Sequence, residues 1–415
     1  MSWADLPPEL VCRIADGLDD LKCYASARGT CPTWRSALTP PSPPLLVDHG
    51  DDPTKRYITT VIKRRKLCPA ACRSFNLTTI PSVRTCLGCC GGWLALSVCI
   101  DGGHSLLSLF HPVMAAEILL PSLIYDSRLV SKMVFAPNPT TDDFLAAVIC
   151  DINRLAYVTV GARRWAVLDP IRLAAGDQIA DLLYHKNGMV YCLTRFGDVH
   201  VLHLPQRRRR EPVILEVHTL ARHIVHNKRI MQMYGTGPDL NALATVETLL
   251  SSVGSNLLFD AATSFAPPYN TISTFTSVNN LVFCDGNLTS RKQGIGHRAV
   301  FTLAPQQPGG GRCRVEHDEI FVLRYDPQRR PCWDVVADLR GHSVFVGRNN
   351  AVSIYAEGVP GLKGDCVYWI GERGRDPGMV YDMKTGRSTP CIPLMDGVIP
   401  GSPQSTICWY FLSDE

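Results

Sequence analysis

Short apolar runs separated by turn-forming residues dominate this chain from about residue 75 onward, and they limit its fold more than any other feature. Each run has the length of a strand, is rich in Val, Tyr, Phe and Trp, and is bounded by Gly, Pro, Asp or Asn. Their spacing of about 8–15 residues suits antiparallel hairpins rather than strand–helix crossovers. The clearest runs are residues 93–96, 106–110, 144–149, 155–160, 190–193, 199–202, 281–284, 320–323, 344–346 and 367–370.

A closed ring of small sheets would accommodate this many strands, because closure removes the exposed edges of a sheet. Roughly 320 residues at ~40–45 per four-stranded blade correspond to about seven blades, give or take one. A weak internal echo agrees with repetition: Trp165 and Trp333 each lie in a late strand run, and Gly197 and Gly386 each mark a turn. We therefore predict a mainly β fold, a β-propeller, with two stacked β-sandwiches as the alternative.

The first 45 residues differ from the rest because they predict short helices. One apolar stripe at helical spacing consists of Leu10, Val11, Ile14 and Leu18. Gly17 is unfavourable inside a helix, so the first helix should end near residue 18. A second helix is expected from residue 19 or 20 to residue 27, and a third from about residue 32, carrying Trp34. Three such helices bury little surface alone, so a partner is expected.

A proline-rich segment at residues 39–44 follows these helices and favours an extended spacer. We expect a helical motif over residues 1–45, a Pro-rich and basic linker over 46–74, a propeller over 75–395 and a C-terminal segment over 396–415. Two basic runs, at residues 63–66 and 207–210, suit either nuclear import or solvated loops.

The N-terminal residues resemble the F-box pattern. They read Leu6-Pro7-Pro8-Glu9-Leu10, then Ile14 and Leu18, then Arg28-Gly-Thr-Cys31-Pro-Thr-Trp34-Arg35-Ser36. The resemblance implies that Leu6, Pro7, Leu10, Ile14 and Leu18 bind a Skp-type adaptor, and through it a cullin, with Trp34 packing the motif together. The chain departs from the pattern at Gly29, Thr30 and Pro32. Because Gly29 and Pro32 lower helix propensity, they would weaken docking. A generic amphipathic helix with a core Trp is the alternative.

Motifs of the β region resemble, in their order along the chain, plant F-box proteins with a KIB-type β-propeller. They are Cys90-Gly-Gly-Trp93-Leu94, Phe110-His-Pro112, Ala180-Asp181, Trp333-Asp-Val-Val-Ala-Asp-Leu339, Val344-Phe-Val-Gly347 and Cys366-Val-Tyr368. The resemblance covers residues 1–48 and 75–390 and implies a three-helix F-box motif before the propeller. Residues 241–277 depart from the family, being rich in Ser, Thr, Asn and Ala, which predicts that one blade is degenerate.

No arrangement typical of covalent chemistry is found. The chain has no phosphate-binding loop, no Gly-x-Ser-x-Gly elbow and no His-Glu-x-x-His motif. Cys68, Cys72, Cys86 and Cys89 have a spacing that could hold zinc, but the family resemblance already explains a Cys before Gly-Gly-Trp. His297 and His342 are candidate pocket residues, although isolated histidines are more often surface or core groups. We therefore predict no catalytic residue, no metal and no cofactor.

Composition limits the partners and the compartment. The net charge of +4 is too mild to argue for nucleic acid, and no apolar run approaches the ~18 residues that a membrane span needs. No secretory signal is visible. We expect an intracellular, soluble protein of the nucleus or cytoplasm whose 17 cysteines are mostly reduced.

These inferences predict a non-catalytic substrate-recognition subunit of an SCF-type (Skp/cullin/F-box) E3 ubiquitin ligase that brings an unknown target protein to ubiquitination. The alternative is a free-standing β-propeller binding module, or a relic with weak adaptor docking. A third option, a propeller enzyme, would require acidic and His side chains that converge in the central channel.

Overall fold

The computed structural model describes residues 3–18, 21–38, 45–49, 56–60, 74–76, 84–99, 105–123, 130–150, 154–168, 178–194, 199–204, 213–218, 256–259, 276–294, 299–303, 312–315, 320–325, 333–357, 359, 362–370, 378–391 and 408–411. The basic runs at residues 63–66 and 207–210, the proline-rich segment and most of residues 241–277 lie outside these ranges. None of the described helices is long and apolar enough to cross a membrane.

The three predicted helices are confirmed. They are α1 (Pro8–Asp16), α2 (Leu21–Gly29) and α3 (Pro32–Ala37), and a 3-10 turn, η1 (Trp3–Asp5), precedes them. Gly17 caps the end of α1, and Pro32 opens α3 at its first position. Gly29 is the last residue of α2. Both departures from the F-box pattern that lower helix propensity therefore stand at helix ends, where Gly and Pro are tolerated.

Seven β-sheets contain the described strands. The first joins the two ends of the chain. In order of neighbours it consists of β28 (Cys408–Tyr410), β1 (Leu45–His49), β2 (Arg56–Thr60) and β3 (Ser74–Asn76). The residues expected to form a linker and a C-terminal segment thus supply β1, β2 and β28. The pairing of β28 with β1 brings strands from the two ends of the chain into one sheet. Pairing of this kind is how a ring of sheets closes.

Three four-stranded sheets follow along the chain. The β4–β7 sheet contains β4 (Arg84–Cys90), β5 (Trp93–Cys99), β6 (Ser105–His111) and β7 (Ala116–Leu119). The β8–β11 sheet contains β8 (Val130–Phe135), β9 (Leu145–Cys150), β10 (Arg154–Thr159) and β11 (Ala166–Leu168). The β12–β15 sheet contains β12 (Ile179–Tyr184), β13 (Met189–Thr194), β14 (Val199–His203) and β15 (Val213–His218).

Three further sheets complete the described strands. The β17–β22 sheet contains β17 (Thr276–Cys284), β18 (Asn287–Gly294), β21 (Ile320–Tyr325) and β22 (Trp333–Val335). The β23–β27 sheet, in the order β24-β23-β25-β26-β27, contains β23 (His342–Val346), β24 (Val352–Tyr355), β25 (Cys366–Trp369), β26 (Met379–Asp382) and β27 (Arg387–Pro390). A smaller sheet contains β16 (Asn256–Phe259), β19 (Ala299–Leu303) and β20 (Arg312–Val315).

All ten apolar runs predicted as strands are strands, and most described pairs are antiparallel, as expected. Two pairs are parallel, β16 with β19 and β23 with β25. In the second case β24 lies on the other side of β23, so the chain returns to β25 by a connection rather than a hairpin.

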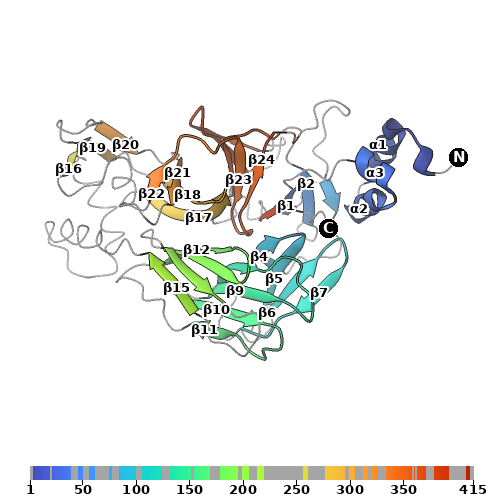
Figure 1. The fold of residues 1–415 in the computed structure, drawn as a ribbon, viewed down its shortest axis with the longest axis horizontal. Coiled ribbons are helices and arrows are strands. Elements are labelled where there is room, and N and C mark those ends of the chain that lie inside the picture. The colour runs from blue at the N-terminus through green and yellow to red at the C-terminus, as the bar shows by residue number, and fades with distance from the viewer. Residues whose placement is uncertain are drawn as a thin grey trace.

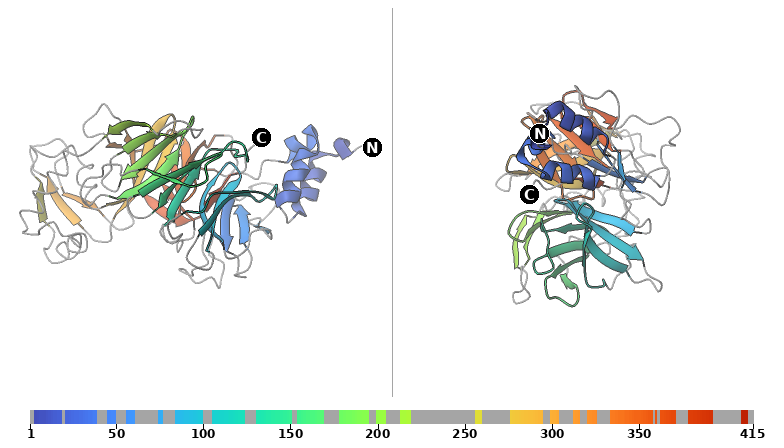
Figure 2. Two further views of the ribbon diagram at one scale, coloured as in Figure 1. Left: turned by 90° about the horizontal axis from the view of Figure 1, so that it is seen from below. Right: turned by 90° about the vertical axis from the view of Figure 1, so that its right-hand side faces the viewer.

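Six of the sheets follow one another around a common centre (Figure 1). Contacts join β28 to β4, β4 to β8, β8 to β12, β12 to β17, and β17 to β23. The Trp409 indole of β28 donates to the Val346 carbonyl of β23 at 3.0 Å, which closes the circuit. The helices and the small β16–β19–β20 sheet lie at opposite ends of the long axis (Figure 2).

Four of the strands through which neighbouring sheets contact one another carry a β-bulge. The register shifts fall between Cys86 and Gly88 in β4, and at the equivalent places in β8, β12 and β17. A bulge bends a strand and re-aims the residue that follows it. In β4 that residue is Gly88, and a Cβ there would lie 2.0 Å from the Met133 carbonyl oxygen of β8. The β4 and β8 backbones approach closely only because this position has no side chain.

We expect Gly88→Ala to lower the free energy of unfolding by about 3 kcal/mol or more, because the added methyl would overlap a neighbouring backbone. Urea unfolding followed by fluorescence measures it. Gly29→Ala is the control, since a Cβ there meets nothing within 4 Å, and it should change stability by less than about 1 kcal/mol. Equal stability of the two variants would contradict the close approach.

Candidate functional site

The first helix has two apolar faces rather than the single predicted stripe. Val11 and Ala15 are buried, whereas Leu10 and Ile14, also one turn apart, are 43% and 40% exposed. Leu18 is only half-buried and packs against the buried hydrophobic cluster that contains Val11 and Ala15, which we call the inward cluster. The expectation that Leu10, Val11, Ile14 and Leu18 share one face is therefore wrong, since at 3.6 residues per turn neighbours such as Leu10 and Val11 point apart.

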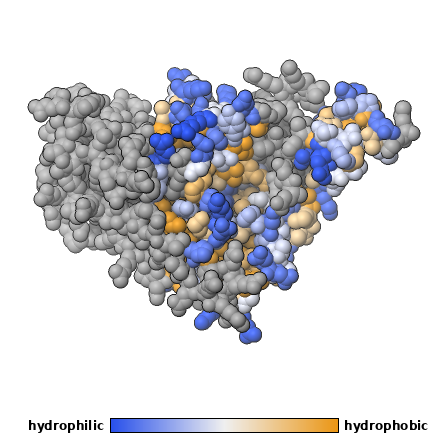
Figure 3. Space-filling view, viewed as in Figure 1, coloured by the Kyte–Doolittle hydropathy of each residue, from blue (hydrophilic) through white to orange (hydrophobic). Residues whose placement is uncertain are grey.

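The predicted adaptor-binding residues divide in the same way. Pro7, Leu10 and Ile14 are exposed, and we refer to these three as the exposed helical face. Leu6 is half-buried and packs against the inward cluster with Leu18. Hydrophobic residues are visible among hydrophilic ones on the helices in the space-filling view (Figure 3). The exposed helical face is the part of the predicted site that a partner can reach without rearrangement of the helices.

Trp34 packs η1 and the three helices together, and we call these four elements the helical unit. Its side chain is buried, and its indole Nε1 donates to the Trp3 carbonyl at 2.8 Å, which holds η1 against α3. Arg28 Nε donates to the Leu38 carbonyl at 3.1 Å and holds α2 to the end of α3. These bonds fix the short helices relative to one another although each is too short to be stable alone.

Trp3 is a surface residue that sequence reasoning missed. Its side chain is 70% exposed although its backbone is fixed by Trp34. Seven large hydrophobic side chains are exposed in the described part of the chain, and three of them, Trp3, Leu10 and Ile14, lie within the first 14 residues. A large aromatic residue outside any apolar run was the available signal. Such a concentration of exposed apolar groups is typical of a protein-binding surface.

A buried carboxylate connects strands of three neighbouring sheets. Asp181 of β12 accepts from Lys132 Nζ of β8 at 2.5 Å and from the Leu281 backbone N–H of β17 at 2.6 Å. Both side chains of the ion pair are almost completely buried. Burial raises the pKa of the Asp181 carboxyl, and the charge of Lys132 and the hydrogen bonds to Asp181 oppose that rise. The Asp181 carboxylate therefore joins the β12–β15 sheet to the sheets that contain β8 and β17.

The connection from β23 to β24 crosses the same region. Arg348 Nη1 donates to the Cys86 carbonyl of β4 at 3.2 Å, and the Asn350 backbone N–H donates to the Cys89 carbonyl at 2.8 Å. The Asn350 amide also accepts from the Tyr184 N–H at 2.8 Å and donates to its carbonyl at 3.1 Å, as a neighbouring strand would. The segment therefore ties β4 and β12 to the β23–β27 sheet.

Only two of the four cysteines whose spacing could hold zinc lie in the described part of the chain. Cys86 and Cys89 are buried, Cys86 Sγ lies 3.6 Å from Cys408 Sγ, and Cys68 and Cys72 lie outside the described residues. No group of three or more His, Cys, Asp or Glu side chains among the described residues could hold a metal ion. Burial raises the pKa of Cys90 to about 12 and of Cys284 to about 11, so these thiols stay protonated.

The described histidines are scattered. His342 Nδ1 lies 3.1 Å from the Leu339 carbonyl, and His297 is outside the described residues. His111 accepts from the Met114 N–H, and its ring packs edge-on against Trp93. His200 of β14 is buried with Nδ1 unpaired, and burial lowers its pKa to about 4. His111 and His200 are buried, His342 is half-buried, and each of the three has different neighbours.

A protein-family comparison gives the ring its identity. The sequence model of the KIB1-4 beta-propeller family matches residues 62–386 of this chain. This chain belongs to the KIB1-4 beta-propeller family. The match confirms the predicted KIB-type domain, and with it a propeller instead of two sandwiches.

Solved structures resemble this KIB1-4 beta-propeller protein only distantly. One is the β-propeller domain of Cps50 (Swd1) from Myceliophteria thermophila, with 11% identity, 84% of this chain and 95% of that chain covered, and a TM-score of 0.27. Another comes from work on two prolyl endopeptidases, with 7% identity and a TM-score of 0.23; the match covers 93% of this chain and 54% of that one. No curated protein matches.

Replacing Asp181 should destabilise the ring strongly. We expect Asp181→Leu to lower the free energy of unfolding by about 3–5 kcal/mol, because Lys132 would stay buried without its counter-ion. The double variant Lys132→Met/Asp181→Leu should recover a large part of that loss. Urea unfolding of the parent, both single variants and the double variant forms a cycle that measures it. Additive losses would mean that the two side chains are not coupled.

The neutral His200 should make stability fall in acid. Its folded pKa of about 4 lies below the unfolded value of 6.5, so the unfolded chain binds the extra proton between these values. The free energy of unfolding should therefore fall as the pH is lowered from about 6.5 through about 4. The total loss is on the order of 3 kcal/mol and is complete only below the folded pKa. His200→Gln should flatten this part of the curve. His203→Gln, exposed on the same strand, is the control and should leave the curve unchanged.

Proposed function

We propose that this KIB1-4 beta-propeller protein is a substrate-recognition subunit of an SCF-type E3 ubiquitin ligase. A β-propeller suggests a protein-interaction module. The proposal adds that the helical unit binds a Skp-type adaptor, and through it a cullin, while the propeller holds a target protein.

The observation that carries the proposal is the division of α1 into two apolar faces. Val11, Ala15 and Trp34 complete a small core, so Leu10 and Ile14 are not needed to hold the helices together. Fully burying a Leu or Ile is worth roughly 1.5–3 kcal/mol, and both side chains keep about two fifths of their surface exposed. An adaptor that covered the exposed helical face would gain part of that free energy from each residue.

Gly29 and Pro32 had favoured a relic with weak docking. Their positions at the end of α2 and the start of α3 remove that reason, because neither interrupts a helix. The relic remains the alternative if the adaptor is not bound.

The proposed mechanism is proximity. Holding adaptor and target at once raises the effective concentration of target lysines near the ubiquitin-bearing enzyme, and no residue of this chain takes part in covalent chemistry. We propose a plant protein of the nucleus or cytoplasm that is not itself an enzyme and binds neither nucleic acid nor membrane.

We infer that the propeller has six blades rather than about seven. The support is the circuit of contacts from β28 through β4, β8, β12 and β17 to β23 and back to β28. The β16–β19–β20 sheet would be an addition, since β19 and β20 come between β18 and β21 in the chain and β16 joins them in parallel.

Charges on the exposed helical face should abolish adaptor binding. We expect a purified Skp-type adaptor to be captured in roughly stoichiometric amount by the parent chain and lost by Leu10→Asp/Ile14→Asp, because the new carboxylates would be buried unpaired. Both positions are exposed, so the variant should keep the parent's circular dichroism and melting temperature.

The control is Leu119→Asp, which places one carboxylate on an apolar residue that is 63% exposed on β7. It should capture the adaptor as well as the parent does. If the folded parent captures no adaptor, the ligase role fails and the protein is a propeller binding module or a relic. If Leu119→Asp also abolishes capture, the exposed helical face is not the docking site.

A further inference from the structure

Three half-buried rings meet between two neighbouring sheets. His185, which follows β12, stacks on Phe283 of β17 with ring centroids 4.1 Å apart. Tyr191 of β13 meets Phe283 edge-on at 5.0 Å. We call these three residues the ring cluster. It joins the β12–β15 and β17–β22 sheets and keeps part of each ring at the surface.

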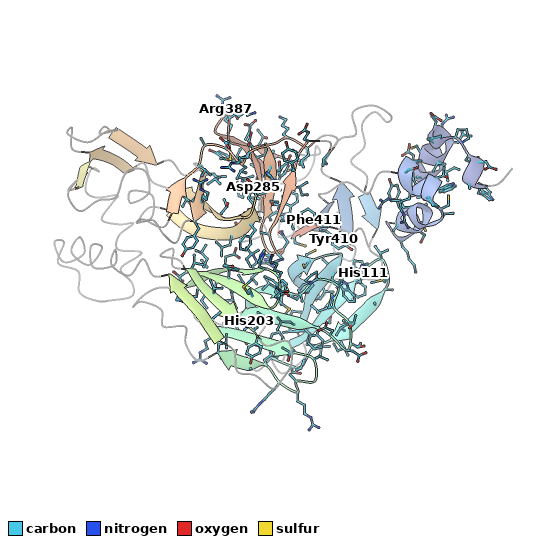
Figure 4. The ribbon with its side chains drawn as sticks, viewed as in Figure 1. His111, His203, Asp285, Arg387, Tyr410 and Phe411 are labelled. Carbon is cyan, nitrogen blue, oxygen red and sulfur yellow. The ribbon has the colours of Figure 1, made fainter. Side chains whose placement is uncertain are left out.

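The turns beside the ring cluster are tight and bear charge. Lys186, next to His185, is exposed, and no described acidic residue pairs with it. Asp285 follows Phe283 by two residues in a hairpin turn with Gly286, and its Oδ2 accepts from Arg340 Nη1 at 3.1 Å. Figure 4 shows Asp285 near the middle of the molecule, by β17 and β23.

Arg340 is held in a conformation that is unfavourable for its residue type. Its φ is +52°, a left-handed value that residues other than Gly, Asn and Asp rarely adopt. The turn is fixed by carboxylates: Asp365 Oδ1 accepts from the N–H groups of Leu339 and Gly341, each at 3.0 Å, and Asp338 accepts from the Arg340 N–H at 3.1 Å. Strained residues that are fixed in this way concentrate at binding sites.

The Arg340 side chain is 66% exposed, and the described residues offer its guanidinium a single acceptor, Asp285. An exposed ion pair of this kind contributes little to stability. Most of the N–H donors of Arg340 therefore remain available for a carboxylate, which a guanidinium can bind with two parallel hydrogen bonds. The free side of the Arg340 guanidinium, rather than a net positive surface, is therefore what would bind a carboxylate of a partner, since Asp285, Asp338 and Asp365 already surround this turn.

We propose that Arg340 and the ring cluster form a peptide-recognition site for an acidic segment in which a carboxylate stands close to an aromatic or large aliphatic side chain. The carboxylate would bind Arg340, and the apolar side chain would pack against the exposed parts of His185, Tyr191 and Phe283. Arg and aromatic residues at a rigid, partly desolvated position are the composition of energetic hot spots in protein interfaces. That the bound protein is a ubiquitination target rests on the proposed function; the binding itself does not.

Fluorescence polarisation with the full chain and labelled synthetic peptides tests this site without the adaptor. The probes carry Asp or Glu beside Phe, Trp or Leu in a Gly-Ser background, with matched peptides in which the acid is an amide or the large side chain is Ala. We expect the parent to bind the acidic-aromatic peptides at least about tenfold more tightly than either matched set. Equal binding of all sets, or of none, overturns the proposal. Adaptor capture with no peptide binding would leave the receptor role standing and remove this site.

Substitutions at Arg340 separate recognition from structure. Arg340→Gly relieves the left-handed backbone, so it should keep or raise the melting temperature and still abolish peptide binding. Arg340→Lys keeps the charge but loses the planar fork, and it should weaken binding by about tenfold. The matched control is Arg387→Lys, an exposed arginine at the molecule's edge in Figure 4, which should bind as the parent does. Unchanged binding by Arg340→Gly would show that Arg340 is not the contact.

Discussion

The buried contacts of Asp181 are the constraint on which the ring depends. The Asp181 carboxylate on β12 accepts one hydrogen bond from a β8 side chain and one from a β17 backbone N–H. Three consecutive sheets therefore meet at this one polar group. A charge without solvent is tolerated only when its partners are fixed, and each of the three strands therefore restricts the other two. The bulges in β8, β12 and β17 fall immediately before or beside the residues concerned, which aims them across the sheets.

A second set of junctions between sheets uses amide and guanidinium groups instead of an ion pair. The segment from Arg348 to Asn350 satisfies backbone groups of β4 and β12, and β28 brings the C-terminal end of the chain beside β4. Side-chain amides and a closing strand here do what the ion pair does between β8 and β12. The hydrogen bonds of Arg348 and Asn350 therefore hold neighbouring sheets together.

The two binding surfaces that we propose lie in different regions of the chain. The helices lie at one end of the long axis (Figure 2), whereas Asp285, the ion-pair partner of Arg340, lies near the middle of the molecule (Figure 4). Two separate surfaces on one chain suit a protein that holds two others at once, since neither contact then obstructs the other.

Sequence alone determined the local features of this protein. The ten apolar runs became strands, and Gly17 and Pro32 marked helix boundaries, because propensity and periodicity act within a few neighbouring residues. The packing role of Trp34 was implied by the resemblance to the F-box pattern. Tertiary structure decided the rest. It separated Leu10 and Ile14 from Val11 and Ala15, drew β1, β2 and β28 into the ring, and brought Asp181 to Leu281 across 100 residues and Asn350 to Tyr184 across 166. Contacts at such separations depend on how whole sheets pack, and no pattern within a short stretch of sequence records that packing.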